Sequence, residues 1–144
     1  MIIRKALPAD AKALSMLAAQ MWRHAPEELE GEFLSLTQDA EAACFLAEAD
    51  GQPCGFAQCQ LRHDYVEGCE SSPVGFLEGV FVTEDHRRTG LGRKLLAACE
   101  DWARTMGCTE FASDCELDNH DSIAWHLSAG FAEMGRTIWF AKKL

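Results

Sequence analysis

The chain has 144 residues, 48% apolar and 25% charged, a composition ordinary for one globular domain with its own core. Its 23 acidic and 13 basic side chains give a formal net charge of −10, which argues against nucleic acid or an anionic membrane as a partner. No apolar run approaches the roughly 20 residues of a membrane span, and the first residues lack a signal-peptide pattern. We therefore expect a single domain, residues 1–144, in the cytoplasm.

The seven cysteines indicate free thiols in a reducing compartment, because their number is odd and no pair has C-x-x-C spacing. No spacing of cysteines and the five histidines matches a zinc site, so we expect no metal. No cysteine stands in a recognisable Cys–His–acid pattern, so we expect no acyl-cysteine either.

Hydrophobic periodicity and turn residues predict alternating strands and helices. In chain order these are a strand at 1–5, a helix after Asp10 reaching Trp22, a helix from Pro26 to about Leu36, strands near 43–49 and 54–62, a loop at 62–73, a strand at 74–82, a helix from about Thr89 to Met106, a strand at 108–114, a helix over 120–129, and strands around 131–135 and 137–143.

Local signals set several of these boundaries. Asp10 can cap the first helix, and Pro26 with the acidic residues after it suits the first turn of the second. The pair Asp50–Gly51 is a common hairpin turn. The order of elements predicts a mixed α/β domain with a largely antiparallel sheet.

The stretch Arg87-Arg88-Thr89-Gly90-Leu91-Gly92 lies between an apolar strand and an amphipathic helix. The N–H groups at a helix N-terminus lack partners, glycines let a phosphate approach the backbone, and arginines add charge. The stretch therefore predicts an anion site, and the alternative is a plain helix entry with solvated arginines.

Two motifs resemble the GCN5-related N-acetyltransferase (GNAT) superfamily. Arg87, Gly90 and Gly92 match its Q/R-x-x-G-x-G/A signature, and NHDSIAWHLSAGF (119–131) keeps three residues of a second, downstream pattern. The resemblance implies the GNAT fold, in which a mixed, mostly antiparallel sheet splits between its fourth and fifth strands and carries about four helices.

The resemblance also implies acetyl-CoA as cosubstrate, with its pyrophosphate on the loop amides and its pantetheine arm along the preceding strand. The implied coenzyme contacts are Val80, Phe81, Val82, Arg87, Arg88, Thr89, Gly90, Leu91, Gly92, Arg93 and Asn119. The Val80 N–H would hold the acetyl carbonyl and its oxyanion. Gly79, in mid-strand, suits a bulge that parts the sheet.

His126 stands where the superfamily often has a tyrosine that protonates the departing thiolate. A histidine can donate a proton near neutral pH. The alternative is that His126 packs the helix, since Trp125 and Leu127 flank it.

Four residues suggest an acidic, aromatic-edged cleft for an amine. Glu78 interrupts an apolar strand, where a carboxylate calls for a cationic partner, and Asp114 ends the next strand. Tyr65 lies in an acidic loop, and Trp22 precedes an acidic segment. Each also has an ordinary interpretation: Trp22 as core, Tyr65 as loop packing, Glu78 as a solvated strand position.

These residues, with the stretches at 62–82 and 112–119, resemble the aminoglycoside 6′-N-acetyltransferases. That resemblance implies that Trp22, Tyr65, Glu78 and Asp114 contact a polycationic antibiotic. It also implies a role in antibiotic resistance and a homodimer.

The mechanism expected is direct transfer. The 6′-ammonium loses a proton to water or to a carboxylate, with Asp114 first and Glu78 second. The free amine attacks the thioester, and His126 or solvent protonates the thiolate.

Two alternatives stay open. One is an acetyltransferase of the same fold that acts on a polyamine or a protein N-terminal amine. The other is a non-catalytic CoA-binding sensor, or an interaction domain whose C-terminal strand RTIWFAKKL (136–144) joins a partner's sheet.

Overall fold

The computed structural model describes residues 1–144. Its elements are β1 (Ile2–Lys5), η1 (Pro8–Asp10), α1 (Ala11–Ala18), α2 (Pro26–Thr37), β2 (Ala42–Ala49), β3 (Gln52–Arg62), β4 (Val74–Val82), η2 (Glu84–His86), α3 (Leu91–Thr105), β5 (Phe111–Ser113) and α4 (His120–Ser128). The predicted α/β class and the four α-helices are confirmed. None of these helices has the length and apolarity needed to cross a membrane.

One mixed sheet has its strands in the order β1-β2-β3-β4-β5. Neighbours are antiparallel from β1 to β4, and β4 and β5 are parallel. The hairpin between β2 and β3 turns at Asp50 and Gly51, with φ of 51° and 76°. Both residues are left-handed, as the type I′ turn of a two-residue hairpin requires, so the predicted turn is confirmed.

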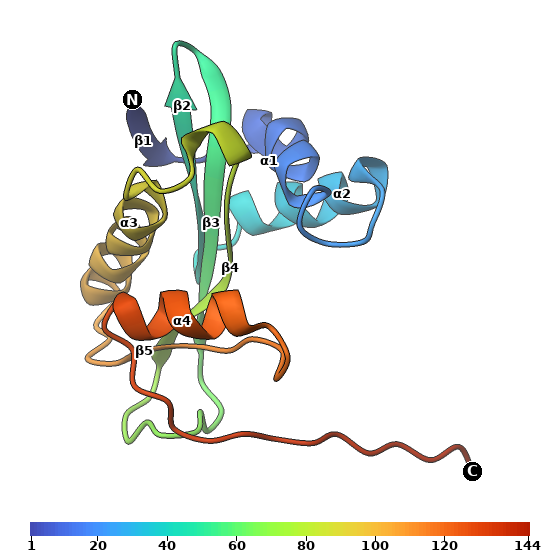
Figure 1. Cartoon of the computed structure of the whole chain (residues 1–144), viewed down its shortest axis with the longest axis vertical. Helices are drawn as coiled ribbons and strands as arrows, with labels where there is room; N and C mark the ends of the chain where they lie inside the picture. The colour runs from blue at the N-terminus through green and yellow to red at the C-terminus, as the bar shows by residue number, and fades with distance from the viewer.

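Helices cover both faces of the sheet: α1 and α2 lie on one side, and α3 on the other (Figure 1). Phe33 of α2 and Phe56 of β3 are fully buried on the first side. On the second side, Leu95 and Cys99 of α3 are fully buried against the sheet, as the apolar stripe of this helix predicts. Burying each such leucine or phenylalanine contributes about 2 kcal/mol.

The start of α1 differs from the prediction, because Asp10 makes no side-chain cap on this helix. Its carboxylate instead accepts two hydrogen bonds of 2.8 Å from the Arg4 guanidinium and one of 2.7 Å from the Leu7 N–H. The guanidinium is a charged donor and outcompetes the helix amides. The helix also ends earlier than expected, at Ala18, and turns carry the chain on to Trp22.

The two strands expected around 131–135 and 137–143 are not formed. After α4 the chain runs outward from the body without pairing (Figure 1). Ile138 is 71% exposed, and Trp139 and Phe140 are each 90% exposed. The sequence pattern predicts strands, but a strand needs a neighbour, and residues 131–144 do not lie beside another strand of this chain.

Candidate functional site

The sheet opens between β4 and β5. These strands are paired only from Gly75–Phe111 to Leu77–Ser113, after which β4 continues to Val82 without β5 beside it. This is the split that the superfamily resemblance implied. It leaves one edge of β4 free along residues 78–82.

A bulge sets which backbone groups face this opening. The register of β3 against β4 shifts between Gln58 and Cys59, and Glu78 is the extra residue. The Thr83 N–H donates to the Cys54 carbonyl at 2.9 Å. Because backbone groups alternate along an antiparallel strand, the N–H groups of Val80 and Val82 point away from β3, into the opening. The geometry therefore presents the Val80 N–H where an acetyl carbonyl would need it.

The N-terminus of α3 lies next to this edge and has no side-chain cap. Arg88 and Gly90 take left-handed conformations, with φ of 62° and 82°. An added side chain at Gly90 would meet nothing within 4 Å. An uncapped helix N-terminus with free backbone N–H groups and open space before it fits a pyrophosphate, as the sequence predicted.

The arginines of this loop and of the first turn of α3 differ in whether their side chains are already bonded within the protein. The Arg87 Nε donates to the Val82 carbonyl at 3.0 Å, and Arg93 donates to the Ser128 carbonyl at 2.7 Å. These two side chains hold the loop to β4 and to the end of α4. Arg88 makes no hydrogen bond or ion pair within the chain, so its guanidinium is available to an anion.

Asn119 and His126 belong to α4. The side-chain oxygen Oδ1 of Asn119 caps the helix by accepting a hydrogen bond from the Ser122 N–H at 3.1 Å. The side-chain NH₂ group of Asn119 is left unused. His126 lies 2.8 Å through Nε2 from the Ser113 hydroxyl and 2.7 Å through Nδ1 from the Ser122 carbonyl. Both ring nitrogens of His126 are therefore engaged inside the protein.

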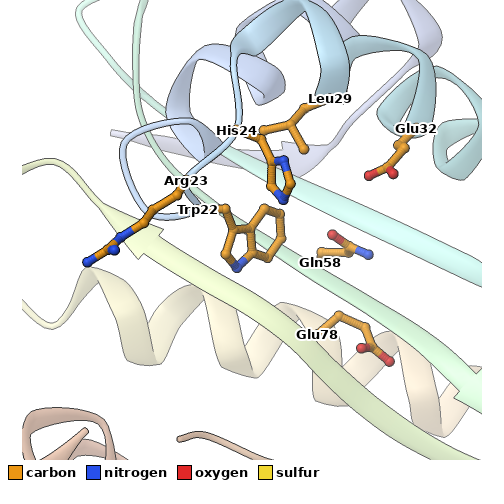
Figure 2. Close-up of a pocket in the computed structure, with 7 residues that line it drawn as sticks. All are labelled: Trp22, Arg23, His24, Leu29, Glu32, Gln58 and Glu78. Atoms are coloured by element: carbon orange, nitrogen blue, oxygen red, sulfur yellow. The ribbon is translucent and has the colours of Figure 1, made fainter. Parts of the chain in front are cut away.

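A hollow of about 400 Å³ lies on the α1–α2 side of β4. It is lined by Trp22, Arg23, His24, Leu29, Glu32, Gln58 and Glu78. Figure 2 shows the Trp22 ring and the Glu78 carboxylate beside this hollow, while the Arg23 side chain points away from them. Trp22 also packs on Phe33 and Phe56, so it is both a core residue and a wall of the hollow.

Glu78 has the cationic partner that its place in an apolar strand called for, but this partner is a residue of the chain itself. Arg62 of β3 donates to Glu78 Oε1 at 2.8 and 3.1 Å and to Oε2 at 3.0 Å. The guanidinium also lies over the Phe76 ring, 3.5 Å from its centre. The cationic partner that Glu78 required is thus supplied by the chain itself, and sequence reasoning missed Arg62. The available signal was that Arg62 ends a long stretch without lysine or arginine and precedes the loop.

The other two predicted substrate residues lie outside this hollow. Tyr65 is 76% exposed and lines a second hollow with Gln60, Leu61, Arg62, His63 and Asp64. Asp114 is exposed and lines neither hollow. The Arg62–Glu78 ion pair joins the two hollows, because Glu78 lines the first and Arg62 the second.

Glu110 fixes the loop that carries Tyr65, a role that no sequence pattern indicated. Its carboxylate accepts from the Ser71 hydroxyl and from the backbone N–H groups of Glu70 and Ser71. These hydrogen bonds, that of the Ser71 hydroxyl first, lower the pKa of Glu110 below its ordinary value. The ionised carboxylate therefore ties the loop to the segment just before β5.

The buried cysteines are poor nucleophiles. Five of the seven are buried, and burial raises the pKa of Cys44 to about 12. A hydrogen bond with Cys59, together with burial, raises the pKa of Cys99 well above its ordinary value. These thiols stay protonated and inert. No group of three or more His, Cys, Asp and Glu side chains is arranged to hold a metal ion.

Known proteins match this chain over nearly its whole length. The model of the acetyltransferase (GNAT) family matches residues 11–131. The aminoglycoside N(6′)-acetyltransferase type 1 of Stenotrophomonas maltophilia is 48% identical over 143 residues, covering 99% of this chain and 93% of that protein.

Two solved structures share the fold closely. The apo aminoglycoside 6′-N-acetyltransferase AAC(6′)-IG from Acinetobacter haemolyticus superposes with a TM-score of 0.94 at 39% identity, covering 100% of this chain and 99% of that one. AAC(6′)-Iy in complex with the bisubstrate analogue CoA-S-monomethyl-acetylneamine has a TM-score of 0.92 at 38% identity, covering 99% of this chain and 98% of that one.

Proposed function

The chain belongs to the acetyltransferase (GNAT) family, and we propose that it transfers an acetyl group from acetyl-CoA to the 6′-amine of aminoglycosides. The observation that carries the proposal is 48% identity, over nearly the whole chain, to a protein named for this reaction. The open edge of β4 beside the uncapped α3 supports it independently, because both features suit a long anionic thioester.

Acetyl-CoA supplies the thioester, and residues of this chain form its binding site. The N–H groups at the start of α3 and the free Arg88 guanidinium bind the pyrophosphate. Arg87, Thr89 and Arg93 act mainly by holding the loop, since their side chains bond to protein carbonyls. The Val80 N–H donates to the acetyl carbonyl, and the Asn119 NH₂ group contacts the coenzyme.

The aminoglycoside binds across the two hollows, with its ammonium groups near Glu78, Glu32 and the acidic loop at Tyr65. Asp114 or a water molecule takes the proton from the 6′-ammonium. Glu78 is the weaker candidate, because three hydrogen bonds from Arg62 already occupy its carboxylate oxygens. The proton that the leaving thiolate takes up comes from His126 or from solvent.

We also infer that two copies associate through the C-terminal residues. Trp139 and Phe140 are almost wholly exposed, which is unusual for a monomer, and aromatic residues of this size bury roughly 150–250 Å² each. β5 is an edge strand, so its outer edge can accept a strand from a second copy. Reciprocal exchange of residues 136–144 would pair both strands at low cost.

The site of action we propose is the cytoplasm, with antibiotic resistance as the role. Seven free cysteines and no disulfide suit a reducing compartment. Acetylation of an amine removes a positive charge that an aminoglycoside would use in binding its own target.

Mass spectrometry tests the reaction directly. The protein is incubated with acetyl-CoA and either tobramycin or paromomycin, which has a 6′-hydroxyl in place of the amine. We expect one acetyl group on tobramycin and none on paromomycin. Acetylation of both antibiotics would exclude 6′-N specificity, and binding of acetyl-CoA without any product would redirect the search to polyamines and peptides.

The base assignment has its own test. In Asp114→Asn, kcat/KM should no longer fall as the pH becomes acidic. Asp118→Asn, in the same loop region, is the control. An unchanged profile in Asp114→Asn would leave the proton transfer to water.

A further inference from the structure

Ser113 occupies the point where the sheet divides. It is the last residue of β5, and its pairing with Leu77 is the last one before β4 and β5 separate. Its hydroxyl is 3.3 Å from the Leu77 carbonyl oxygen, which faces β5. The side chain therefore sits at the inner end of the opening that the Val80 N–H also faces.

The hydroxyl is held by His126, and the hydrogen bonds define how. Nδ1 of His126 is 2.7 Å from the Ser122 carbonyl, which can only accept, so Nδ1 carries a hydrogen. In the neutral ring, Nε2 then accepts from the Ser113 hydroxyl at 2.8 Å. In the imidazolium, Nε2 donates to the same oxygen, and the serine hydrogen turns to the Leu77 carbonyl or into the opening. The neutral and the protonated His126 ring are therefore both hydrogen-bonded within the same set of groups: the ring itself, the Ser122 carbonyl, the Ser113 hydroxyl and the Leu77 carbonyl.

The ring has little freedom to do anything else. Phe131 lies 5.2 Å and Trp125 5.0 Å from it, centroid to centroid; the Phe131 ring is tilted against it and the Trp125 ring stands edge-on. Ser113 connects the His126 ring to β4, because its hydroxyl lies within hydrogen-bond distance of both His126 Nε2 and the Leu77 carbonyl.

We propose that the Ser113 hydroxyl is the group that protonates the departing coenzyme A thiolate, and that His126 acts through it as a positioning and proton-supplying residue. The inference rests on the proposed acetyl transfer. As the carbon–sulfur bond breaks, its electron pair goes to sulfur, and Ser113 donates its hydrogen there. The serine oxygen takes the Nε2 proton of the His126 imidazolium in the same step. The ring becomes neutral and regains a proton from solvent before the next turnover.

The first test is single-turnover acetyl transfer to tobramycin at saturating acetyl-CoA. Ser113→Ala should lower the transfer rate about 100-fold while the KM for acetyl-CoA changes little, because a general acid acts only in the transition state. Ser113→Thr keeps the hydroxyl and should restore most of the rate. Ser128→Ala is the matched control, since Ser128 donates only to a carbonyl of its own helix on the exposed side of α4. A rate in Ser113→Ala equal to that of Ser128→Ala would overturn the proposal.

The second test needs no turnover. Nitrogen NMR of histidine-labelled protein follows the His126 ring, assigned by loss of its signal in His126→Gln. Coenzyme A should shift this signal and desulfo-coenzyme A should not, and the difference should vanish in Ser113→Ala. Equal shifts with both ligands in the wild-type protein would show that Ser113 does not face the thiol. If no aminoglycoside is acetylated but this difference is found, the proposed acceptor fails while the role of Ser113 stands.

Discussion

Gly79 lets β4 pass close under the ring of Trp22. A Cβ atom added at Gly79 would lie 2.8 Å from Trp22 Cζ2 and 3.2 Å from the Met21 methyl carbon. Any side chain at this position must therefore move the aromatic wall of the first hollow. The bulge at Glu78 and the glycine after it thus shape both sides of β4, the open edge and the hollow.

We expect Gly79→Ala to raise the KM for tobramycin about ten-fold, since displacing a packed ring costs on the order of 1 kcal/mol. The KM for acetyl-CoA should change less. Gly31→Ala is the control, because an added Cβ there meets nothing within 4 Å. Steady-state kinetics with both substrates decide the matter, and equal KM values for tobramycin in the two variants would mean that Trp22 does not contact the antibiotic.

The Arg4–Asp10 pair makes stability depend on pH. Hydrogen bonds from Arg4 lower the pKa of Asp10 below its ordinary value. A carboxyl of this kind contributes stability above its unfolded pKa of about 4, and the contribution is lost as the pH falls through the folded pKa.

We therefore expect Asp10→Asn to be less stable than wild type by about 1 kcal/mol at neutral pH, and the two free energies of unfolding to converge as the pH falls through the folded pKa of Asp10. Urea denaturation at several pH values measures this, with Glu30→Gln, an exposed carboxylate of α2, as the control. A constant difference across the whole pH range would show that the pair does not titrate on unfolding.

At the scale of elements, the last residues of the chain have the side-chain pattern of a strand but do not form one. The first part of the segment is anchored, since an added Cβ at Gly68 would strike Met134. Beyond it, residues 136–144 expose Ile138, Trp139 and Phe140. Because these residues have no partner strand within their own chain, the association of two chains should change their structure more than that of any other segment.

Removal of residues 136–144 should convert a dimer into a monomer. Sedimentation equilibrium should give about twice the 15.9 kDa chain mass for the full-length protein and the single chain mass for the truncated one. Trp139→Asp should weaken association in the same direction, whereas Lys142→Ala should not. A monomeric full-length protein at the concentrations used for kinetics would refute the exchange.

At the scale of the whole molecule, the net charge of the protein has an effect separate from that of the carboxylates lining the first hollow. Glu78 is neutralised by Arg62, so the first hollow is less acidic than its lining residues suggest. The net charge of −10 nevertheless creates a field around the entire protein. Capture of a polycation then depends on this field, which salt screens over about 8 Å at physiological ionic strength.

We expect kcat/KM for tobramycin to fall roughly ten-fold between about 20 and 200 mM salt, with kcat nearly constant, because screening slows encounter and not transfer. A monoamine acceptor, if turned over, should show a much weaker dependence. An unchanged kcat/KM for tobramycin would assign the negative charge to solubility alone.

Sequence alone determined the class of fold, the hairpin turn at Asp50–Gly51, the helices and the glycine-containing loop that precedes α3. These features depend on local rules: side-chain periodicity, left-handed turn residues, and the unpaired N–H groups at a helix start. For the same reason the motif residues around Gly90 predict a coenzyme site from the sequence alone.

Only the tertiary structure decided how the charged and polar side chains are paired. Asp10 bonds to Arg4 rather than to its helix, Glu78 to Arg62, and Ser113 to His126, and each pair joins elements distant in sequence. Such partners are chosen by register and packing, which a single strand or helix pattern does not contain. The C-terminal residues are the converse case: the strands predicted from their side-chain pattern are not formed, because pairing is a property of two strands and these residues lie beside no other strand of the chain.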